Sequence, residues 1–319
     1  MFNFLKGALL TGLSLFLMVS AGCRSDGSGG GDRDTTPGSQ SSGAADVRTG
    51  ATNAGAIHGG SVYDIDRPFL AAALHGDLVE ISGLTVLPDG RLGAVQDEDG
   101  VVFVLGRESG EIVERWSFGG AGDYEGIEHA GDRVFVLRSD GTLIEISGWA
   151  GDAPATRVIE TVLTERNDTE GLTYDASRNR LLIACKERPG AGLGDRYKSI
   201  YAFDLTALDL TGDALLPDPV FTIDREAVER QSGENGEFKP SALAVHPATG
   251  AVYVLSSTTQ VMAVLDGGGV LQSVIQLSPD LFEQPEGLAF LPDGTLYISS
   301  EGDDGPGMLY AFRAETGGR

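Results

Sequence analysis

Hydrophobic positions along the chain recur in short blocks that are separated by polar turns. Runs of four or five apolar residues, such as Leu181–Cys185 and Val252–Leu255, alternate with turns rich in Gly, Asp and Pro, such as Pro88-Asp89-Gly90. Almost no stretch repeats its apolar residues with the period of a helix. Short apolar strands with Gly, Asp and Pro between them predict an all-β fold.

One short phrase occurs five times within these blocks. Its anchor is a Leu or Ile, preceded by Gly or Ala and, one residue earlier, by Glu or Ser; the anchors are Leu84, Ile127, Leu172, Leu243 and Leu288. Successive anchors are 43, 45, 71 and 45 residues apart. Three of these gaps match the repeat of about 40–50 residues that is typical of a propeller blade. With four predicted strands per unit, the sequence indicates a five-bladed β-propeller of four-stranded blades.

The two ends of the repeat predict how the ring closes. The fifth unit ends soon after Met308–Phe312 without an outer strand, and Pro68–Leu74 precedes the first anchor. We expect this N-terminal segment to supply the missing strand, because pairing removes a free sheet edge. The 71-residue gap leaves six blades as an alternative, with a degenerate blade in residues 187–240. We prefer an insertion with a short helix at Asp224–Arg230.

The first 22 residues differ from this pattern. Lys6 is their only charged residue, and the apolar run Ala8–Val19 is too short to span a bilayer comfortably. Residues 1–22 are therefore predicted to be a secretory signal peptide. The small residues before Cys23 resemble a bacterial lipobox, which implies cleavage before Cys23 and lipid on this residue. An ordinary signal peptide and an uncleaved anchor are the alternatives.

Residues 23–60 are predicted to be a disordered tether, because they are rich in Gly and Ser and contain no Phe, Trp or Tyr. Residues 61–315 then form the propeller domain. A lipidated Cys23 would hold this domain at the membrane, outside the cytoplasm. We therefore expect a lipoprotein of the cell envelope, and Arg24 after the cysteine favours the outer membrane where a cell has two membranes.

Composition excludes several classes of function. The 23 basic and 47 acidic residues give a net charge of −24, and nucleic-acid binding needs a basic face. Two cysteines and four scattered histidines do not suggest a disulfide scaffold or a His-rich zinc site. Cys185 lies in an apolar run and is expected to be a buried, inert thiol. The chain has no G-x-S-x-G, H-E-x-x-H or P-loop motif, so spacing identifies no nucleophile–base pair.

Equivalent positions of a propeller repeat form rings around the central channel. The residues two before the anchors give a first ring, which consists of Ser82, Glu125, Glu170, Ser241 and Glu286. The ends of the next strands give a second ring at the channel mouth, which consists of Asp97, Ser139, Lys186, Ser257 and Glu301, with Glu187 beside Lys186.

Three glutamates near one axis require compensation. Two carboxylates about 5 Å apart repel by about 3 kcal/mol at an effective dielectric constant of about 20. Oxygen ligands without His or Cys select a hard ion, and Ca²⁺ accepts their flexible geometry best. The expected ligands are Glu125, Glu170 and Glu286, with Asp97, Glu187 and Glu301 as second candidates. Alternatively, the glutamates cap strand ends and pair with Lys186, Arg138 or Lys239.

The stretches around the five anchors resemble the SdiA-regulated (YjiK-like) family of bacterial extracytoplasmic proteins. They are Ile81–Val95, Asp123–Ile127, Asn167–Tyr174, Lys239–Pro247 and Gln284–Gly302. The resemblance implies a five-bladed propeller, distantly related to NHL-repeat propellers, with a calcium site and no known activity. A looser likeness links the same phrase to phytase-like and esterase-like propellers. Ser82 and Ser241 depart from the Glu of the other three repeats.

Two functions follow as hypotheses. The first is a monomeric binding module that presents its channel mouth to a small molecule or a protein. The second is a metal-dependent hydrolase of phosphate esters or lactones, in which Glu125, Glu170 or Glu187 serves as metal ligand or general base. The absence of a nucleophile favours the binding module, and whether the chain is an enzyme stays open because propellers host both functions.

Overall fold

The computed structural model describes residues 61–151, 154–190, 192–212, 214–233, 236–303 and 305–316. Contacts divide the chain into Met1–Thr52 and Asn53–Arg319, and all described residues belong to the second unit. The predicted signal peptide, Cys23 and the predicted tether therefore lie outside the described residues. Within the described part, no helix is long and apolar enough to cross a membrane.

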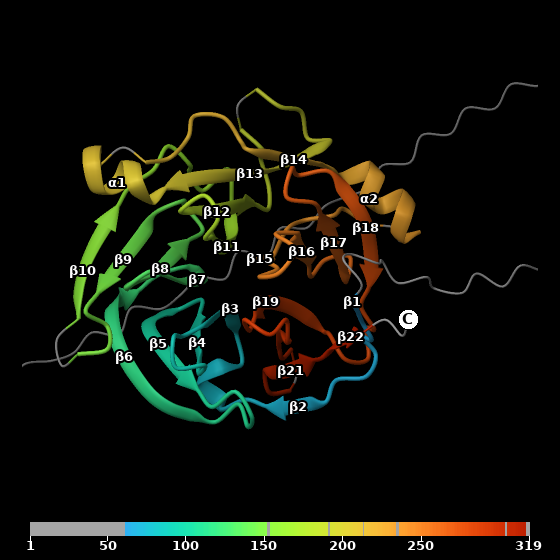
Figure 1. The fold of residues 1–319 in the computed structure, drawn as a ribbon, viewed down its shortest axis with the longest axis horizontal. Helices are drawn as coiled ribbons and strands as arrows, with labels where there is room; N and C mark the ends of the chain where they lie inside the picture. The colour runs from blue at the N-terminus through green and yellow to red at the C-terminus, as the bar shows by residue number, and fades with distance from the viewer. Residues whose placement is uncertain are drawn as a thin grey trace, which may run out of the picture. The chain divides into compact units, whose positions relative to one another are not determined.

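Five four-stranded antiparallel sheets surround a central axis, and the first strand of each sheet lies nearest to this axis (Figure 1). Blade 1 contains β3 (Ile81–Val86), β4 (Leu92–Gln96), β5 (Asp99–Leu105) and β6 (Ile112–Ala121). Blade 2 contains β7 (Tyr124–Ala130), β8 (Arg133–Arg138), β9 (Leu143–Ser147) and β10 (Ala155–Ile159). Blade 3 contains β11 (Thr169–Asp175), β12 (Arg180–Cys185), β13 (Tyr197–Asp204) and β14 (Phe221–Asp224).

The remaining two blades follow the same order from the axis outward. Blade 4 contains β15 (Ala242–Val245), β16 (Val252–Ser256), β17 (Val261–Leu265) and β18 (Leu271–Gln276). Blade 5 contains β19 (Gln284–Phe290), β20 (Leu296–Glu301), β21 (Met308–Phe312) and β2 (Leu70–Ala73). The fold is therefore the five-bladed β-propeller that the sequence predicts.

The ring is closed by both ends of the domain. Strand β2 pairs antiparallel with β21 and completes blade 5, which confirms the predicted closure by Pro68–Leu74. A second closure was not predicted: β1 (Ser61–Tyr63) pairs with β22 (Ala314–Thr316) in a separate two-stranded sheet. A short 3₁₀ helix, η1 (Gly76–Leu78), then connects β2 with β3.

The 71-residue gap is explained by blade 3. Strand β14 pairs with β13 as the outer strand of this blade, so the alternative of a sixth blade is wrong. Helix α1 (Leu205–Thr211), which the sequence did not predict, lies between these two strands and is capped by the side chain of Asp204. Helix α2 (Arg225–Ser232) follows β14, close to the helix expected at Asp224–Arg230.

The core consists of five apolar clusters, and each cluster fills the space between two neighbouring blades. Strand β12 shows how one sequence serves two clusters: Leu181 and Ile183 face the cluster toward blade 2, whereas Leu182 and Ala184 face the cluster toward blade 4. Strands buried on both sides become continuous apolar runs. Each cluster also contains one anchor of the repeat: Leu84, Ile127, Leu172, Leu243 or Leu288.

The glycine before the anchor allows the inner strands to approach one another. A Cβ on Gly83 would lie 2.9 Å from the backbone nitrogen of Ile127, and a Cβ on Gly126 would lie 2.9 Å from Cβ of Leu172. The void that remains between the strands is only about 10 Å³, roughly the space of one water. We call this constriction the throat. It separates the upper mouth, where the inner strands begin, from the lower mouth, where they end.

Candidate functional site

The first predicted ring lies at the upper mouth, directly above the throat. Its three glutamates come from β7, β11 and β19, and they border the throat together with Ser82 and four glycines. The two serines of the ring hold neighbouring strands. The hydroxyl of Ser82 donates to the carbonyl oxygen of Tyr124 at 2.6 Å, and that of Ser241 donates to the carbonyl oxygen of Pro285 at 2.8 Å. Each serine thus fixes the residue that precedes the next blade's glutamate.

Glu170 is the most buried of the three glutamates, with 4% of its surface exposed. Its Oε1 accepts a hydrogen bond from Nζ of Lys186, which makes an ion pair. Its Oε2 is buried and has no hydrogen-bond partner. The expected pairing with a base therefore holds for Glu170, but it satisfies only one of the two carboxylate oxygens.

The three glutamates perturb one another. Burial raises the pKa of Glu125 to about 8, and the nearby carboxylates of Asp123 and Glu286 add to this rise. Burial and repulsion by Glu286 and Glu125 hold the pKa of Glu170 well above its usual range, although Lys186 opposes them. Burial also raises the pKa of Glu286. The structure therefore brings the three predicted ligands within electrostatic reach around one ammonium group.

Two acidic residues of the second ring extend this cluster toward blade 1. Burial raises the pKa of Glu301, at the end of β20, to about 8, with further repulsion from Glu286, Asp97 and Glu80. Burial raises the pKa of Asp97 to about 6, with repulsion from Glu80 and Glu98. The Oδ1 atom of Asp97 is buried without a partner. These two carboxylates belong to the same electrostatic cluster as Glu286.

The other members of the second ring have partners of their own. The hydroxyl of Ser139 donates to the carboxylate of Asp123, and Ser257 forms a hydrogen bond that lowers the pKa of Glu286. Glu187, a second candidate for the metal, points elsewhere: Lys239 binds its half-exposed carboxylate, and this hydrogen bond lowers its pKa. The structure thus does not bring Glu187 to the three glutamates.

Lys186 is held in place by a second lysine. Lys198, on β13, is only 2% exposed, and its Nζ donates to the carbonyl oxygen of Lys186 at 2.6 Å and to that of Glu187 at 3.3 Å. The same ammonium group lies 3.2 Å from a carboxylate oxygen of Glu237. Because a buried ammonium needs such partners, Lys198 fixes the backbone that carries both charged side chains.

Sequence reasoning missed a further ring that is in register with the first two. The residues four before the anchors are Glu80, Asp123, Asp168, Lys239 and Gln284. Three of them act on the site: Glu80 raises the pKa of Asp97 and Glu301, Asp123 that of Glu125, and Asp168 that of Lys186. Extending the alignment of the repeats by two residues would have found them.

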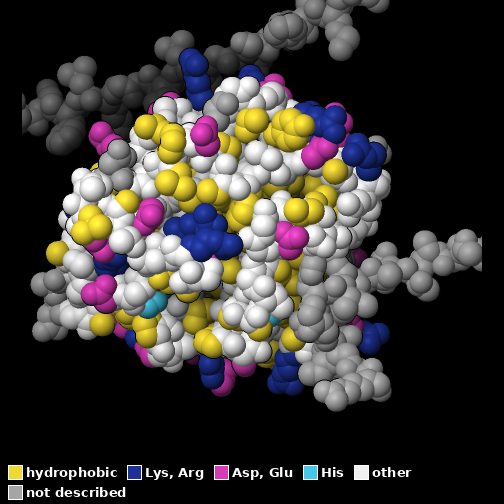
Figure 2. Space-filling view, turned by 45° about the horizontal axis from the view of Figure 1, so that its top comes forward, with side chains coloured by type: hydrophobic (Ala, Val, Ile, Leu, Met, Phe, Trp, Pro, Cys, Tyr) yellow, Lys and Arg dark blue, Asp and Glu magenta, His cyan; other side chains and the backbone are white. Residues whose placement is uncertain are grey.

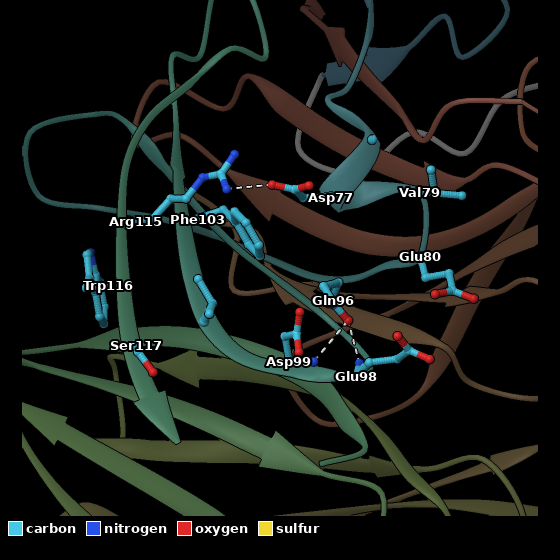
Figure 3. A pocket seen from close by; sticks show the side chains of 12 residues that line it. Asp77, Val79, Glu80, Gln96, Glu98, Asp99, Phe103, Arg115, Trp116 and Ser117 are labelled. Atoms are coloured by element: carbon cyan, nitrogen blue, oxygen red, sulfur yellow. Dashed lines mark hydrogen bonds and ion pairs between the residues drawn. The ribbon is translucent and has the colours of Figure 1, made fainter. Parts of the chain in front are cut away.

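A groove lies on blade 1 between the 3₁₀ helix η1 and strands β5 and β6 (Figure 3). Its volume is about 560 Å³, and Glu80 and Glu98 lie at one end of it. At the other end, Arg115 forms an ion pair with Asp77 at 2.5 Å and lies over the ring of Phe103. The groove therefore offers acidic, basic and aromatic groups side by side.

Charged side chains of both signs are present on the face that Figure 2 shows. On the face that Figure 2 shows, Lys and Arg side chains gather near the centre, and Asp and Glu side chains are scattered around them. No broad basic surface of the kind that binds nucleic acid is seen on this face.

The chemistry of the upper mouth fits a hard cation in part. Its donors are carboxylate and hydroxyl oxygens, and the unpartnered Oε2 of Glu170 is an oxygen that a cation would satisfy. Among the described residues, however, no group of three or more His, Cys, Asp or Glu is arranged to hold a metal ion. The glutamates lie near enough to repel one another, but they do not converge on one point.

The fold and the acidic mouth define the chain as a five-bladed β-propeller of repeating four-stranded units. The family model of the SdiA-regulated proteins matches residues 69–313, and the chain belongs to this family. The glutaminyl cyclase of Myxococcus xanthus has a similar fold, with a TM-score of 0.53, 18% identity, and 78% of this chain and 95% of that chain covered. A PQQ-bound aldose sugar dehydrogenase of Streptomyces coelicolor follows with a TM-score of 0.48, 13% identity, and 78% and 98% covered.

The likeness to the glutaminyl cyclase concerns the fold alone, because the identity is below the level at which function can be transferred. No curated protein matches the chain.

Proposed function

We propose that this propeller is a binding module of the cell envelope whose upper mouth holds Ca²⁺ and receives a ligand beside it. The observation that carries the proposal is the buried, unpartnered Oε2 of Glu170, whose pKa is raised by two further glutamates that themselves have raised pKa values. An unpaired buried carboxylate oxygen is costly. A divalent cation would satisfy this oxygen and would remove the repulsion among the three glutamates.

Glu170, Glu125 and Glu286 would hold the ion, with Glu301 and Asp97 near enough to add charge. The proposal requires the three glutamates to draw together on binding, because they do not converge in the structure. Lys186 competes with the ion, since its ammonium already occupies one oxygen of Glu170. We therefore expect an affinity in the range of extracellular calcium modules, on the order of 10⁻⁴ to 10⁻³ M.

Calorimetric titration of the protein with CaCl₂ at pH 7.5 tests this proposal. The wild type should give binding heat, and Glu170→Gln should remove it. Glu114→Gln is the matched control, because Glu114 is an exposed carboxylate that pairs with Arg91 on the outside of blade 1. Absence of heat and of any thermal shift with millimolar Ca²⁺ in the wild type would overturn the proposal, and so would unchanged binding by Glu170→Gln.

The groove across blade 1 supports a ligand site beside the ion. It joins carboxylates to an aromatic ring and an Arg115–Asp77 pair, a combination that suits a polar small molecule or a polar protein segment. The high negative charge of the chain makes nucleic acid an unsuitable partner. We therefore expect a polar ligand, of unspecified identity, to bind at the upper mouth and in the groove.

A second candidate function rests on the raised pKa of Glu125 and Glu301. Both values are about 8, which suits a general acid or base at neutral pH. In that case the chain would be a metal-dependent hydrolase of phosphate esters or lactones. Turnover that EDTA abolishes and that Glu125→Gln removes would favour this function. Flat rates across phosphoester, lactone and carboxylester substrates would favour the binding module.

The location at the envelope rests on Cys23 and on the sequence before it. We propose that lipid on Cys23 tethers the propeller to a membrane. Expression of the full chain in a bacterium with labelled palmitate should yield a labelled, membrane-associated protein. Cys23→Ala should release the protein into the soluble fraction without the label. Unlabelled wild-type protein in the soluble fraction would contradict the anchor and would leave the calcium proposal untouched.

A further inference from the structure

The lower mouth forms a second hollow with a volume of about 670 Å³. The residues directly after the five anchors line it: Thr85, Glu128, Thr173, Ala244 and Ala289. They lie three residues along the inner strands from the first ring of the upper mouth, a distance of about 10 Å. Because the throat is closed by the glycine contacts, this hollow opens only at the lower end of the channel.

Glu128 is the one charged residue among these five positions, and three blades contact it. Its Oε1 accepts hydrogen bonds from Oγ1 of Thr85 and from the backbone nitrogen of His129, both at 3.0 Å. Thr173 and the backbone nitrogen of Tyr174 also form hydrogen bonds with it. Burial nevertheless raises its pKa to about 7. Among the residues that the structure describes, no Lys or Arg forms an ion pair with it.

The other acidic groups at this hollow are compensated. Nε of Arg91 lies 2.6 Å from a carboxylate oxygen of Asp89. Asp293 accepts a hydrogen bond from the backbone nitrogen of Thr295 at 2.9 Å, and this bond lowers its pKa, as does nearby Arg107. Among the described residues that line the lower mouth, Glu128 is therefore the acid that lacks an opposite charge.

His129 borders the same hollow but does not supply this opposite charge. Burial lowers its pKa, so its imidazole is neutral at pH 7, and its Nε2 has no hydrogen-bond partner. Its ring packs edge-on against Trp149, with 5.7 Å between the ring centroids. Trp149 in turn stacks on Trp116. The indole fluorescence of this pair should therefore respond to a molecule that enters the lower mouth beside His129.

Most of the remaining wall is apolar. It includes Val86, Leu87, Pro88, Val245, Phe290 and Leu291. A wide apolar pocket with a few converging polar groups is the usual form of a small-molecule site. An anionic ligand would meet the uncompensated carboxylate, and a purely apolar ligand would leave this carboxylate without a partner.

We propose that the lower mouth is a second binding site, which takes a small organic monocation with an apolar body and places the cationic group against Glu128. The apolar body lies along Val245 and Phe290. This site is independent of the proposed calcium site, because the throat separates them.

Titration with 4-phenylbutylammonium tests the proposal, with 4-phenylbutanol and 4-phenylbutyrate as matched probes. The protein's tryptophan fluorescence and calorimetry give the affinities. The ammonium compound should bind at least about tenfold more tightly than the alcohol, as expected for a hydrogen bond to a charged group, and the carboxylate should bind least. Its affinity should rise as the pH increases from 6 to 8, because Glu128 ionises while the amine stays charged. Equal affinity for the three probes, or no binding of the ammonium compound at 10 mM, would overturn the proposal.

Two variants locate the site. Glu128→Gln should weaken binding of the ammonium compound at least about tenfold and should leave the calcium heat unchanged. Val245→Phe narrows the hollow without touching Glu128, so it should weaken all apolar probes and keeps the test decisive if Glu128→Gln does not fold. Wild-type affinity in a folded Glu128→Gln, or in Val245→Phe, would contradict the assignment. Loss of calcium binding in Glu170→Gln with normal ammonium binding would separate the two sites.

Discussion

The same five strands build both mouths of the channel, yet the glutamates at the two mouths have different partners. At the upper mouth three glutamates share one ammonium group, and a carboxylate oxygen of Glu170 has no partner. At the lower mouth a single glutamate, Glu128, is surrounded by hydroxyl and backbone donors from three blades. Repetition of an acid around a ring thus creates repulsion that an added cation can relieve. A single acid in the ring can instead connect the blades.

The close approach of the inner strands at the throat is the feature whose loss should lower the stability of the protein most. In Gly126→Val the new side chain would meet Cβ of Leu172 and the carbonyl oxygen of Glu170. The inner strands of blades 2 and 3 would have to part, which should cost about 3 kcal/mol in the free energy of unfolding. Urea denaturation measures this loss. Gly76→Ala, where a Cβ would have open space, is the control and should change stability by less than about 0.5 kcal/mol.

Removing the lysine should unbalance the upper mouth alone. Lys186→Met leaves Glu170 buried beside two like charges, so we expect a loss of about 2 kcal/mol at pH 8. This value is below that of a fully buried pair because Lys186 is partly exposed and Glu170 can take up a proton. Lys239→Met, which breaks the half-exposed pair with Glu187, should cost less than about 1 kcal/mol. Equal losses in the two variants would contradict the central role of Lys186. The same Lys186→Met should also bind Ca²⁺ more tightly.

Neutral replacements of the two kinds of glutamate should stabilise the protein to different extents. At pH 8 Glu125→Gln removes a buried like charge from the upper mouth and should stabilise the protein by more than about 1 kcal/mol. Glu128→Gln also removes a buried charge, but it replaces an acceptor of several hydrogen bonds by an amide, so its gain should be smaller by at least about 1 kcal/mol. Denaturation curves of both variants at pH 8 measure the two changes. An equal gain in both would show that the two mouths do not differ in the way described.

The pH dependence of stability should distinguish the mouths more finely. The pKa of Glu125 is about 8 and that of Glu128 about 7, both above the value near 4.5 in the unfolded chain. The folded state then binds more protons at these two groups, so their contribution to stability is fully present below about pH 4.5 and is lost as the pH rises through the folded pKa values. Glu125→Gln should flatten this fall up to pH 8, and Glu128→Gln only up to pH 7, each by at most about 1.4 kcal/mol per pH unit. Identical pH profiles of wild type and variants would contradict the raised pKa values.

The fold was predictable because all five anchor residues have the same structural role, which is to pack between neighbouring blades. Each of the five Leu or Ile anchors enters a different cluster between blades, so their spacing in the sequence reflects the spacing of blades around the ring. The antiparallel closure through β2 followed from the missing outer strand of the last unit. The pairing of β1 with β22 was not predictable, because these three-residue strands carry no alternating pattern of their own.

The candidate site was predictable only as a set of positions. The repeat placed Glu125, Glu170 and Glu286 in one ring, and in the structure they lie near enough to raise the pKa of Glu125 and Glu170. The repeat did not predict which side chain would turn toward the glutamates: Lys186 pairs with Glu170, whereas the adjacent Glu187 pairs with Lys239. The buried Lys198, which fixes this stretch of backbone, lies in an apolar run without any signal of its role. Side-chain direction depends on such local partners.

Anomalous diffraction from crystals grown with CaCl₂ tests most directly the claim that the upper mouth is a cation site. We expect an anomalous peak beside Oε2 of Glu170, with the carboxylates of Glu125 and Glu286 turned toward it, and no such peak in crystals of Glu170→Gln. A wild-type map without density at this position, with Lys186 still bound to Glu170, would show that the upper mouth is not a cation site.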